Sequence, residues 1–335
     1  MTTMVPMHRD VQLYEELISN AQRGLAEGVA SSLSRLFDPQ HGGVNPAPDQ
    51  RSSTHCVHLR KAVLVACWND WGAVVATMWD ALCTLTSVNL ATNVFLTDDA
   101  SNCDSVLQHA VRRGSENVIK VLFKLRKPAR KPTRKPKRKP KRGAWLCDID
   151  DYNSIDETPL DCAAHAGQVH AARLLLRCNA HVDGSGDLEE TPLRTAILKD
   201  DVRMARLLLD SKANVAYECC FYTPLHLAAR HNRLRIIGAL IDARADVNAA
   251  SSRGRRTPLH TAAEYGHAQT VSAILCARGD ATKCDMHGNT PLMLARSNDA
   301  KTRFAETIGV LARSNDAKTR FAETIGVLEA LLAGK

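Results

Sequence analysis

The tripeptide Thr-Pro-Leu occurs five times at a nearly constant spacing, and this spacing limits the fold more than any other feature of the chain. The copies begin at Thr158, Thr191, Thr223, Thr257 and Thr290, at intervals of 33, 32, 34 and 33 residues. A fixed period of this length is typical of stacked repeat architectures. We therefore expect an array of similar units rather than one large core.

Each copy is followed by the pattern of two short helices. The Thr suits the N-cap because its side-chain oxygen accepts from backbone N–H groups of the first turn, and the Pro suits the first helical position, where no donor is needed. Small residues such as Ala228-Ala229 let the two helices approach closely, while pairs such as Leu174-Leu175, Leu207-Leu208 and Leu240-Ile241 form the apolar face of the second helix. One unit cannot bury that face alone, so the units must stack. The predicted fold class is all-α.

Several segments resemble the ankyrin repeat, notably TPLHLAA from Thr223, TPLHTAAEYGH from Thr257 and DMHGNTPL from Asp285. A degenerate sixth unit, SVLQHAVRRGSENVIKVLF, begins at Ser105. The resemblance covers residues 104–335. It implies a solenoid of stacked helix-turn-helix units with hairpin loops, preceded here by a small helical N-terminal region.

The chain departs from the ankyrin pattern where the second helix of a repeat ends. The family usually has a left-handed Gly there, but the corresponding residues of this chain are Asn179, Lys212, Arg244 and Arg278. Asn tolerates a left-handed backbone, whereas Lys and Arg each cost about 1 kcal/mol relative to Gly. We expect an array that is less stable than a consensus array.

The sequence pattern divides the chain into four predicted regions. The predicted regions are an N-terminal amphipathic helix in residues 1–37, a loop in 38–58, a helical segment of decayed repeats in 59–100, and the array in 104–335, interrupted by a basic insert at 124–142. The amphipathic helix is predicted as one element from Asp10 to Phe37. Trp68, Trp71 and Trp79 are expected in the core of the helical segment; the alternative is an exposed aromatic docking face.

The C-terminal end carries a perfect duplication. The segment ARSNDAKTRFAETIGVL occupies residues 295–311 and is repeated at 312–328. Both copies have an apolar stripe at helical spacing, so either is able to serve as the final helix of the array.

The formal net charge of +8 comes from one segment. Twelve of the 44 Lys and Arg residues fall within 124–142, which contains no acid, so the remainder carries 32 bases against 36 acids. Proline at every fourth residue excludes a helix there, and we expect an extended, solvated loop. Any function that depends on positive charge is therefore expected at this insert.

Three interpretations of the insert stay open: a nuclear import signal, a contact to nucleic acid or another polyanion through phosphates, and a neutral expansion. The absence of aromatic residues would make nucleic-acid binding salt-sensitive and independent of base sequence. The basic residues concerned are Lys127, Arg130, Lys131, Arg134, Lys135, Lys137, Arg138, Lys139, Lys141 and Arg142.

The eleven cysteines form no disulfide framework, and the adjacent pair Cys219-Cys220 is poorly placed to close on itself. The N-terminus lacks the basic and apolar parts of a secretory signal. We therefore expect reduced thiols and a cytoplasmic or nuclear location, or both. No apolar stretch is long enough to favour a membrane span.

We expect no metal, no cofactor and no catalytic site. His55, Cys56 and His58 are three ligand types within four residues, but a second ligand pair at zinc spacing is missing. His226 and His260 stand at the His position of the repeat, and the family resemblance implies that they bond to the backbone of neighbouring units. No nucleotide-binding, metalloprotease or nucleophile-elbow motif is present.

The resemblance also suggests where a partner binds and one site of modification. Partners of ankyrin arrays usually contact the concave face, and counting along the repeats assigns to it Phe221, Tyr222, Arg230, His231, Arg253, Arg255, Arg256, Glu264 and Tyr265. Tyr, Trp and Arg are enriched in interface hot spots. Asn248, with Leu240 eight residues before it and Asp246-Val247 just before it, matches a context hydroxylated in some ankyrin proteins; the alternative is a turn Asn that satisfies local backbone groups.

The predicted function is protein–protein recognition by a monomeric adaptor or scaffold. A nuclear factor that contacts nucleic acid or another polyanion through the insert is the first alternative. A substrate receptor of a ubiquitin-ligase-type assembly, docked through its N-terminal helices, is the second. Salt titration separates the first two, because phosphate contacts weaken steeply with salt.

Overall fold

A computed structural model describes residues 6–37, 54–85, 105–124, 149–153, 155–184, 190–295 and 324–331, with the single residues 94, 297 and 333. The chain divides into two compact units, Met1–Ser185 and Gly186–Lys335. In the described residues the regular secondary structure is helical, apart from one bridge between Cys219 and Tyr222. The predicted all-α class is confirmed.

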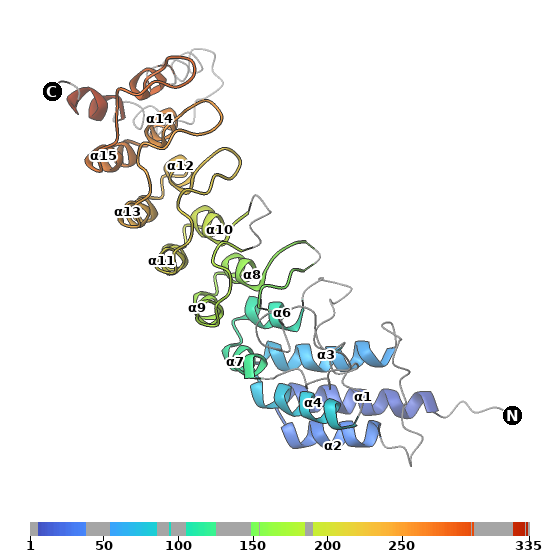
Figure 1. Ribbon diagram of the computed structural model, residues 1–335. Coiled ribbons are helices and arrows are strands. Elements are labelled where there is room, and N and C mark those ends of the chain that lie inside the picture. The colour runs from blue at the N-terminus through green and yellow to red at the C-terminus, as the bar shows by residue number, and fades with distance from the viewer. Residues whose placement is uncertain are drawn as a thin grey trace, which may run out of the picture. The chain divides into compact units, whose positions relative to one another are not determined.

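The N-terminal unit is a stack of helix pairs (Figure 1). Its helices are α1 (Pro6–Gln22), α2 (Ala26–Leu36), α3 (Thr54–Trp68), α4 (Gly72–Leu85), α6 (Val106–Arg113), α7 (Glu116–Lys124), α8 (Pro159–Ala166) and α9 (Val169–Arg177). The first helices of successive pairs, α1, α3, α6 and α8, contact one another in that order. The second helices, α2, α4, α7 and α9, form a parallel row.

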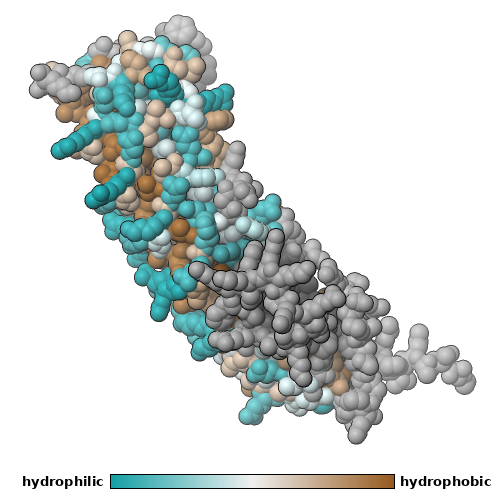
Figure 2. Space-filling model, in the orientation of Figure 1, coloured by the Kyte–Doolittle hydropathy of each residue, from teal (hydrophilic) through white to brown (hydrophobic). Residues whose placement is uncertain are grey.

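The C-terminal unit repeats this arrangement (Figure 1). Its helices are α10 (Pro192–Leu198), α11 (Val202–Asp210), α12 (Pro224–Arg230), α13 (Leu234–Asp242), α14 (Pro258–Glu264) and α15 (Ala268–Cys276). Helices α10, α12 and α14 form one row and α11, α13 and α15 the other. On the face of this unit that Figure 2 shows, hydrophobic side chains lie between hydrophilic ones rather than in one block.

The predicted N-caps are confirmed at the start of the first helices. Thr158, Thr191, Thr223 and Thr257 each accept from the backbone N–H three residues later, with Pro following at once. Ser105 does the same at α6, where Gln108 completes a capping box. The Thr-Pro signal thus fixes where each of these helices begins.

Two of these caps also join neighbouring pairs, as the resemblance implied. Thr223 Oγ1 lies 2.8 Å from His226 Nδ1, and His226 Nε2 lies 2.8 Å from the carbonyl oxygen of Arg256. His260 Nε2 reaches the carbonyl oxygen of Asn289 at 3.0 Å. Burial lowers the pKa of both imidazoles, so each is neutral at pH 7 and donates through Nε2.

A left-handed residue follows the first helix of every pair. The φ angles are 70° at Gly24, 56° at Asp70, 73° at Gly114, 68° at Gly167, 59° at Asp200, 56° at Asn232 and 69° at Gly266. Gly, Asn and Asp are the residues that adopt this conformation most readily. The shared turn shows that α1–α2 and α3–α4 are built like the later pairs, although they lack Thr-Pro-Leu.

The structure corrects the predicted boundaries in this region. The segment from Asp10 to Phe37 is two helices, α1 and α2, because the chain reverses at Gly24. A Cβ on Gly24 would lie 2.8 Å from the ring of Trp71, so both the φ of 70° and the closeness of this ring favour Gly at the reversal. Helix α3 begins at Thr54, inside the predicted loop 38–58.

The predicted tryptophan core is wrong for two of its three members. Trp79 is 4% exposed, but Trp68 and Trp71 are 53% and 42% exposed. Trp68 lies under the guanidinium of Arg113, 5.3 Å from the ring centroid. Trp68 is the last residue of α3, and Trp71 lies in the turn that follows it. Both side chains therefore lie at the end of the helix pair rather than in its interior.

The second copy of the C-terminal duplication contributes to the core. Residues 324–331 are helical, and Leu328 is fully buried with Ala262, Ala263 and Val271 of the last pair. The first copy, apart from residues 295 and 297, lies outside the described residues.

Left-handed backbone is also found just after α9, α11, α13 and α15, the second helices of the last four described pairs. The φ angles are 66° at Asn179, 70° at Lys212, 64° at Arg244 and 66° at Arg278. These are the positions at which the family usually has Gly, and a side chain there costs about 1 kcal/mol.

Replacement of these residues by Gly is expected to stabilise the protein. Lys212→Gly, Arg244→Gly and Arg278→Gly should each raise the free energy of unfolding by about 1 kcal/mol, because Gly adopts positive φ without steric strain. Urea unfolding followed by circular dichroism measures the change. Arg206→Gly, on the exposed side of α11, is the matched control and should lose about 1 kcal/mol. Loss of stability in all four variants would contradict the assignment of strain.

Among the helices that the structure describes, none is long and apolar enough to cross a membrane.

Candidate functional site

An open groove of about 440 Å³ lies on the C-terminal unit, where the loops before α12 and α14 meet the loop before Thr290. Its walls combine aromatic, aliphatic and basic side chains. They are Cys220, Phe221, Tyr222, Arg230, Arg253, Gly254, Arg256, Met286 and His287.

The first wall of the groove is a tight hairpin. Cys219 and Tyr222 exchange two backbone hydrogen bonds, both 3.0 Å long. The two residues at the tip, Cys220 and Phe221, have φ angles of 50° and 71°. This is the geometry of a type I′ turn, which strongly prefers Asn-Gly because both central residues are left-handed. Cys-Phe at the tip costs about 1 kcal/mol or more per residue.

The other two walls are joined by backbone. The second loop is closed by a 2.8 Å bond from Ser251 N–H to the carbonyl oxygen of Arg256, and Gly254 turns within it at φ 90°. The N–H of Met286 donates to the carbonyl oxygen of Gly254 at 2.9 Å. Met286 is 62% exposed beside this junction, so an apolar side chain projects from a well-bonded backbone.

The arginines of the groove fall into two kinds. Arg256 is neutralised, because its guanidinium lies 2.7 Å from Glu264 Oε2 and 3.7 Å from Asp285 Oδ2. Burial alone would raise the pKa of Asp285, but backbone N–H donors and Arg256 lower it. This carboxylate is therefore ionised and already paired at neutral pH.

Arg230 and Arg253 are the second kind. Arg253 lies 5.5 Å from the ring centroid of Phe221, and Arg230 lies 5.4 Å from that of Tyr265. Within the described residues neither guanidinium pairs with a carboxylate. The groove thus presents two positive charges, each resting on an aromatic ring, which suits a negatively charged ligand with an apolar part.

The structure brings together most of the residues that the repeat positions predicted. Five of the nine line the groove: Phe221, Tyr222, Arg230, Arg253 and Arg256. Glu264 and Tyr265 adjoin it through their contacts with Arg256 and Arg230. His231 and Arg255 are exposed but do not line it.

Sequence reasoning missed Cys220, Gly254, Met286 and His287. A signal for the last two was present, since DMHGN before Thr290 occupies the same repeat position as the loops before Thr223 and Thr257. The prediction stopped at two units, whereas the groove uses three loops.

Asn248 has a bonded role in the structure. Its Nδ2 donates to the carbonyl oxygen of Arg278 at 3.1 Å, and its Oδ1 accepts from the N–H of Asp280 at 2.8 Å. The side chain thus links its own turn to the next turn of the array, and these two bonds are not to local backbone. Hydroxylation of Asn248 stays a prediction.

The basic insert and the cluster around His55 are not part of this geometry. Residues 125–148 lie outside the described residues, as do the side chains of His55 and Cys56. In the part of the chain whose side chains are described, no group of three His, Cys, Asp or Glu residues is arranged to hold a metal ion.

Comparison with known families gives one match. The family model for ankyrin repeats, which spans three copies, matches residues 139–219, 178–251 and 225–318. No curated protein matches the chain.

Proposed function

Because the chain belongs to the ankyrin repeat family, we propose that it binds a protein partner, and that the groove receives an acidic segment of that partner with an aromatic or aliphatic anchor. Ankyrin repeats are in general protein–protein interaction modules. The identity of the groove and the chemistry of its ligand are the parts proposed here.

The observation that carries the proposal is Phe221. An aromatic side chain occupies the second central position of a type I′ turn, where Gly is strongly favoured, and its ring is left half exposed beneath Arg253. Strained backbone that persists at an exposed site is typical of functional positions. The ring of Phe221 also holds the guanidinium of Arg253 in place. Large aromatic rings bury much apolar surface on binding and are therefore frequent anchors of interfaces.

Charge supports the acidic part of the ligand. Arg230 and Arg253 pair with no described carboxylate, while Glu264 and Asp285, the acids that contact Arg256 of the groove, are both held by that arginine. An incoming Asp or Glu is therefore attracted by two cations without competition from a neighbouring acid. Met286 and Phe221 offer apolar surface for the anchor.

Peptide display tests the proposal without knowledge of the partner. Peptides are selected on the immobilised full chain alone, and their affinity for each variant is measured afterwards. The selected peptides are expected to contain two or more acids next to an aromatic or aliphatic residue. Their affinity should fall about tenfold in Phe221→Ala and in Arg253→Ala, while the melting temperature stays within a few degrees.

Two matched variants serve as controls. Tyr152→Ala removes an exposed aromatic residue of the N-terminal unit, and Arg235→Ala removes an exposed base of α13; both should bind normally. Peptides without acids, or equal affinity for all variants, would contradict the proposal. Early melting of Phe221→Ala would instead show that the ring packs between loops.

The alternative functions stay predictions. Nuclear import and polyanion binding depend on residues 124–142, and the ubiquitin-ligase alternative depends on a partner of the N-terminal helices. Binding of double-stranded DNA is measured separately, at several salt concentrations, for the full chain and for Phe221→Ala. Affinity that falls steeply with salt and is the same for both proteins would assign polyanion binding to the insert rather than to the groove.

A further inference from the structure

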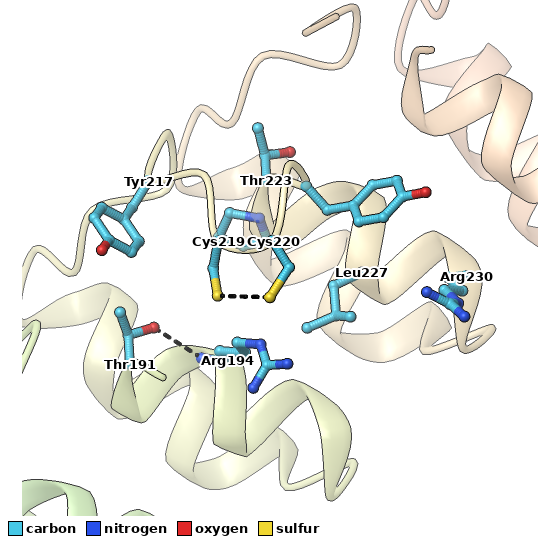
Figure 3. Close-up of a pocket in the computed structure, with 10 residues that line it drawn as sticks. Thr191, Arg194, Tyr217, Cys219, Cys220, Thr223, Leu227 and Arg230 are labelled. Carbon is cyan, nitrogen blue, oxygen red and sulfur yellow. Dashed lines mark hydrogen bonds between the residues drawn. The ribbon is translucent and has the colours of Figure 1, made fainter. Parts of the chain in front are cut away.

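Two neighbouring thiols lie at the tip of the hairpin that forms the first wall of the groove. Cys219 Sγ and Cys220 Sγ are 3.7 Å apart. Cys219 is buried, whereas Cys220 is exposed. Figure 3 shows both sulfur atoms pointing to the same side of the hairpin, toward Arg194 of α10.

The thiols line a small cavity that adjoins the groove at the hairpin and at Arg230 of α12. The cavity, of about 90 Å³, is lined in addition by Thr191, Tyr217, Leu227 and their neighbours. Cys220, Tyr222 and Arg230 line both the cavity and the groove. A chemical change at the thiols therefore acts on residues that also shape the groove.

We propose that Cys219 and Cys220 form a reversible oxidation site, at which a peroxide converts the two thiols into a disulfide between neighbouring residues. The thiolate of exposed Cys220 attacks one peroxide oxygen, and the O–O bond breaks to give a sulfenic acid and hydroxide. The hydroxide takes up the proton that the Cys220 thiol released on ionisation and becomes the first water. The thiol of Cys219 then attacks the sulfenic sulfur, which releases the second water. Two thiols are oxidised and one peroxide is reduced to two waters.

Proximity favours this pair. The sulfur atoms are already on one side of the hairpin, and they must approach by less than about 2 Å to reach a disulfide bond length. The exposed thiolate is attacked first, and the resolving thiol is the adjacent residue. The buried position of Cys219 shields it from direct oxidation, which keeps it available as the resolving thiol.

Strain makes the product easy to reduce. Consecutive Cα atoms are about 3.8 Å apart, below the range of about 4.4–6.8 Å found in ordinary disulfides. A strained disulfide has a more oxidising potential than a structural one and belongs to the labile, regulatory class. The bond is therefore expected to open again in the presence of a thiol such as dithiothreitol.

The same strain connects the chemistry to the groove. Closing the bond forces the backbone of Cys219 and Cys220 to move, and this backbone carries the two hydrogen bonds to Tyr222 and the left-handed tip. Phe221, at the other tip position, is then displaced from beneath Arg253. This step rests on the proposed function, because it makes oxidation a control on ligand binding in the groove.

Trypsin cleaves out a peptide that reports this reaction directly. Cleavage after Lys212 and Arg230 releases residues 213–230, which contain Cys219 and Cys220 and no other cysteine. The full chain is treated with hydrogen peroxide, alkylated, digested and weighed by mass spectrometry. The expected peptide is two hydrogens lighter than the reduced form and carries no alkyl group; after dithiothreitol it carries two.

Controls and a structural readout accompany the mass measurement. Cys219→Ser and Cys220→Ser should give no such product, and the peptides of exposed Cys276 and Cys284 should be recovered alkylated or singly oxidised. Hydrogen exchange at the Tyr222 amide, which donates to the carbonyl oxygen of Cys219, should become faster on oxidation. Recovery of residues 213–230 with two alkyl groups after peroxide would overturn the proposal.

Failure of this proposal is distinguishable from failure of the proposed function. A selected acidic peptide that binds the reduced chain, together with an unoxidised pair, would refute only the oxidation site. A disulfide that forms in a chain to which no acidic peptide binds would refute only the groove. If the disulfide forms and Tyr222 exchange or peptide affinity is unchanged, the link between them is wrong.

Discussion

A Glu157→Gln variant is expected to lose about 2 kcal/mol of unfolding free energy at pH 6, after allowance for the part of the carboxylate that solvent screens. Glu157 lies before α8 and collects several donors. Its carboxylate is 2.5 Å from Arg112 Nη2 and 2.6 Å from His165 Nδ1, and Cys162 Sγ donates to it at 3.5 Å. The amide of Gln cannot replace the charge that these contacts share.

The loss should depend on pH in a defined direction. The hydrogen bond from His165, with the charge of Arg112 and against the effect of burial, lowers the pKa of Glu157 from 4.5 to about 2. A lowered pKa contributes stability that is complete above pH 4.5 and disappears as pH falls toward 2. Urea unfolding at pH 6 and pH 3 should therefore show a large difference between wild type and Glu157→Gln at pH 6, and a smaller one at pH 3.

The matched control is Glu116→Gln, which removes an exposed ion pair with Lys120 on α7. An exposed pair of this kind is worth about 0.5 kcal/mol or less. An equal loss for Glu157→Gln at both pH values would show that the effect is steric rather than electrostatic.

An Asp161→Asn variant is expected to gain about 2 kcal/mol at pH 7.5. Asp161 lies one turn beyond Glu157, and its carboxylate accepts from Thr158 N–H at 3.0 Å and from Thr158 Oγ1 at 2.7 Å. These bonds do not outweigh its burial, which raises the pKa of Asp161 to about 6. Asn keeps an oxygen acceptor for the cap and removes the buried charge.

The sign of the pH dependence is opposite to that of Glu157. A raised pKa favours the fold fully below pH 3.8, and this contribution is lost as pH rises through about 6. The gain of Asp161→Asn should therefore be present at pH 7.5 and vanish near pH 4 in urea unfolding. Asp201→Asn, which changes the N-cap acceptor of α11, should have a small effect at both pH values. Destabilisation of Asp161→Asn at pH 7.5 would contradict the prediction.

The sequence predicts the later helix pairs well because their signals are local. Thr223 caps its own helix and Pro224 suits the next position, so the start of α12 requires no knowledge of distant residues. The left-handed positions of Lys212 and Arg244 are likewise set by repeat register. The resemblance to the family also predicts the hydrogen bond from His226 to the backbone of the next pair, which the structure has at Arg256.

The first two pairs could not be predicted in the same way. Gly24 adopts the left-handed φ of the reversal and lies against the ring of Trp71, almost fifty residues later, but no Thr-Pro-Leu stands near it to mark the repeat. Trp68 and Trp71 follow an apolar helix and look like core residues, yet they fall where the pair ends. The third loop of the groove was missed because loops of successive repeats, about 33 residues apart in the sequence, meet only in the stack.

In the C-terminal unit each helix pair contacts the pairs next to it. This arrangement determines how the unit responds to mechanical tension. In that unit α12–α13 has a pair on each side, whereas α10–α11 and α14–α15 each lie at one side of it. A pulling force applied to both ends should therefore remove the helix pairs in separate steps, because each pair is held only by the elements packed next to it. The hairpin that carries Phe221 leads into the middle pair, and it should be among the last parts of this unit to unravel.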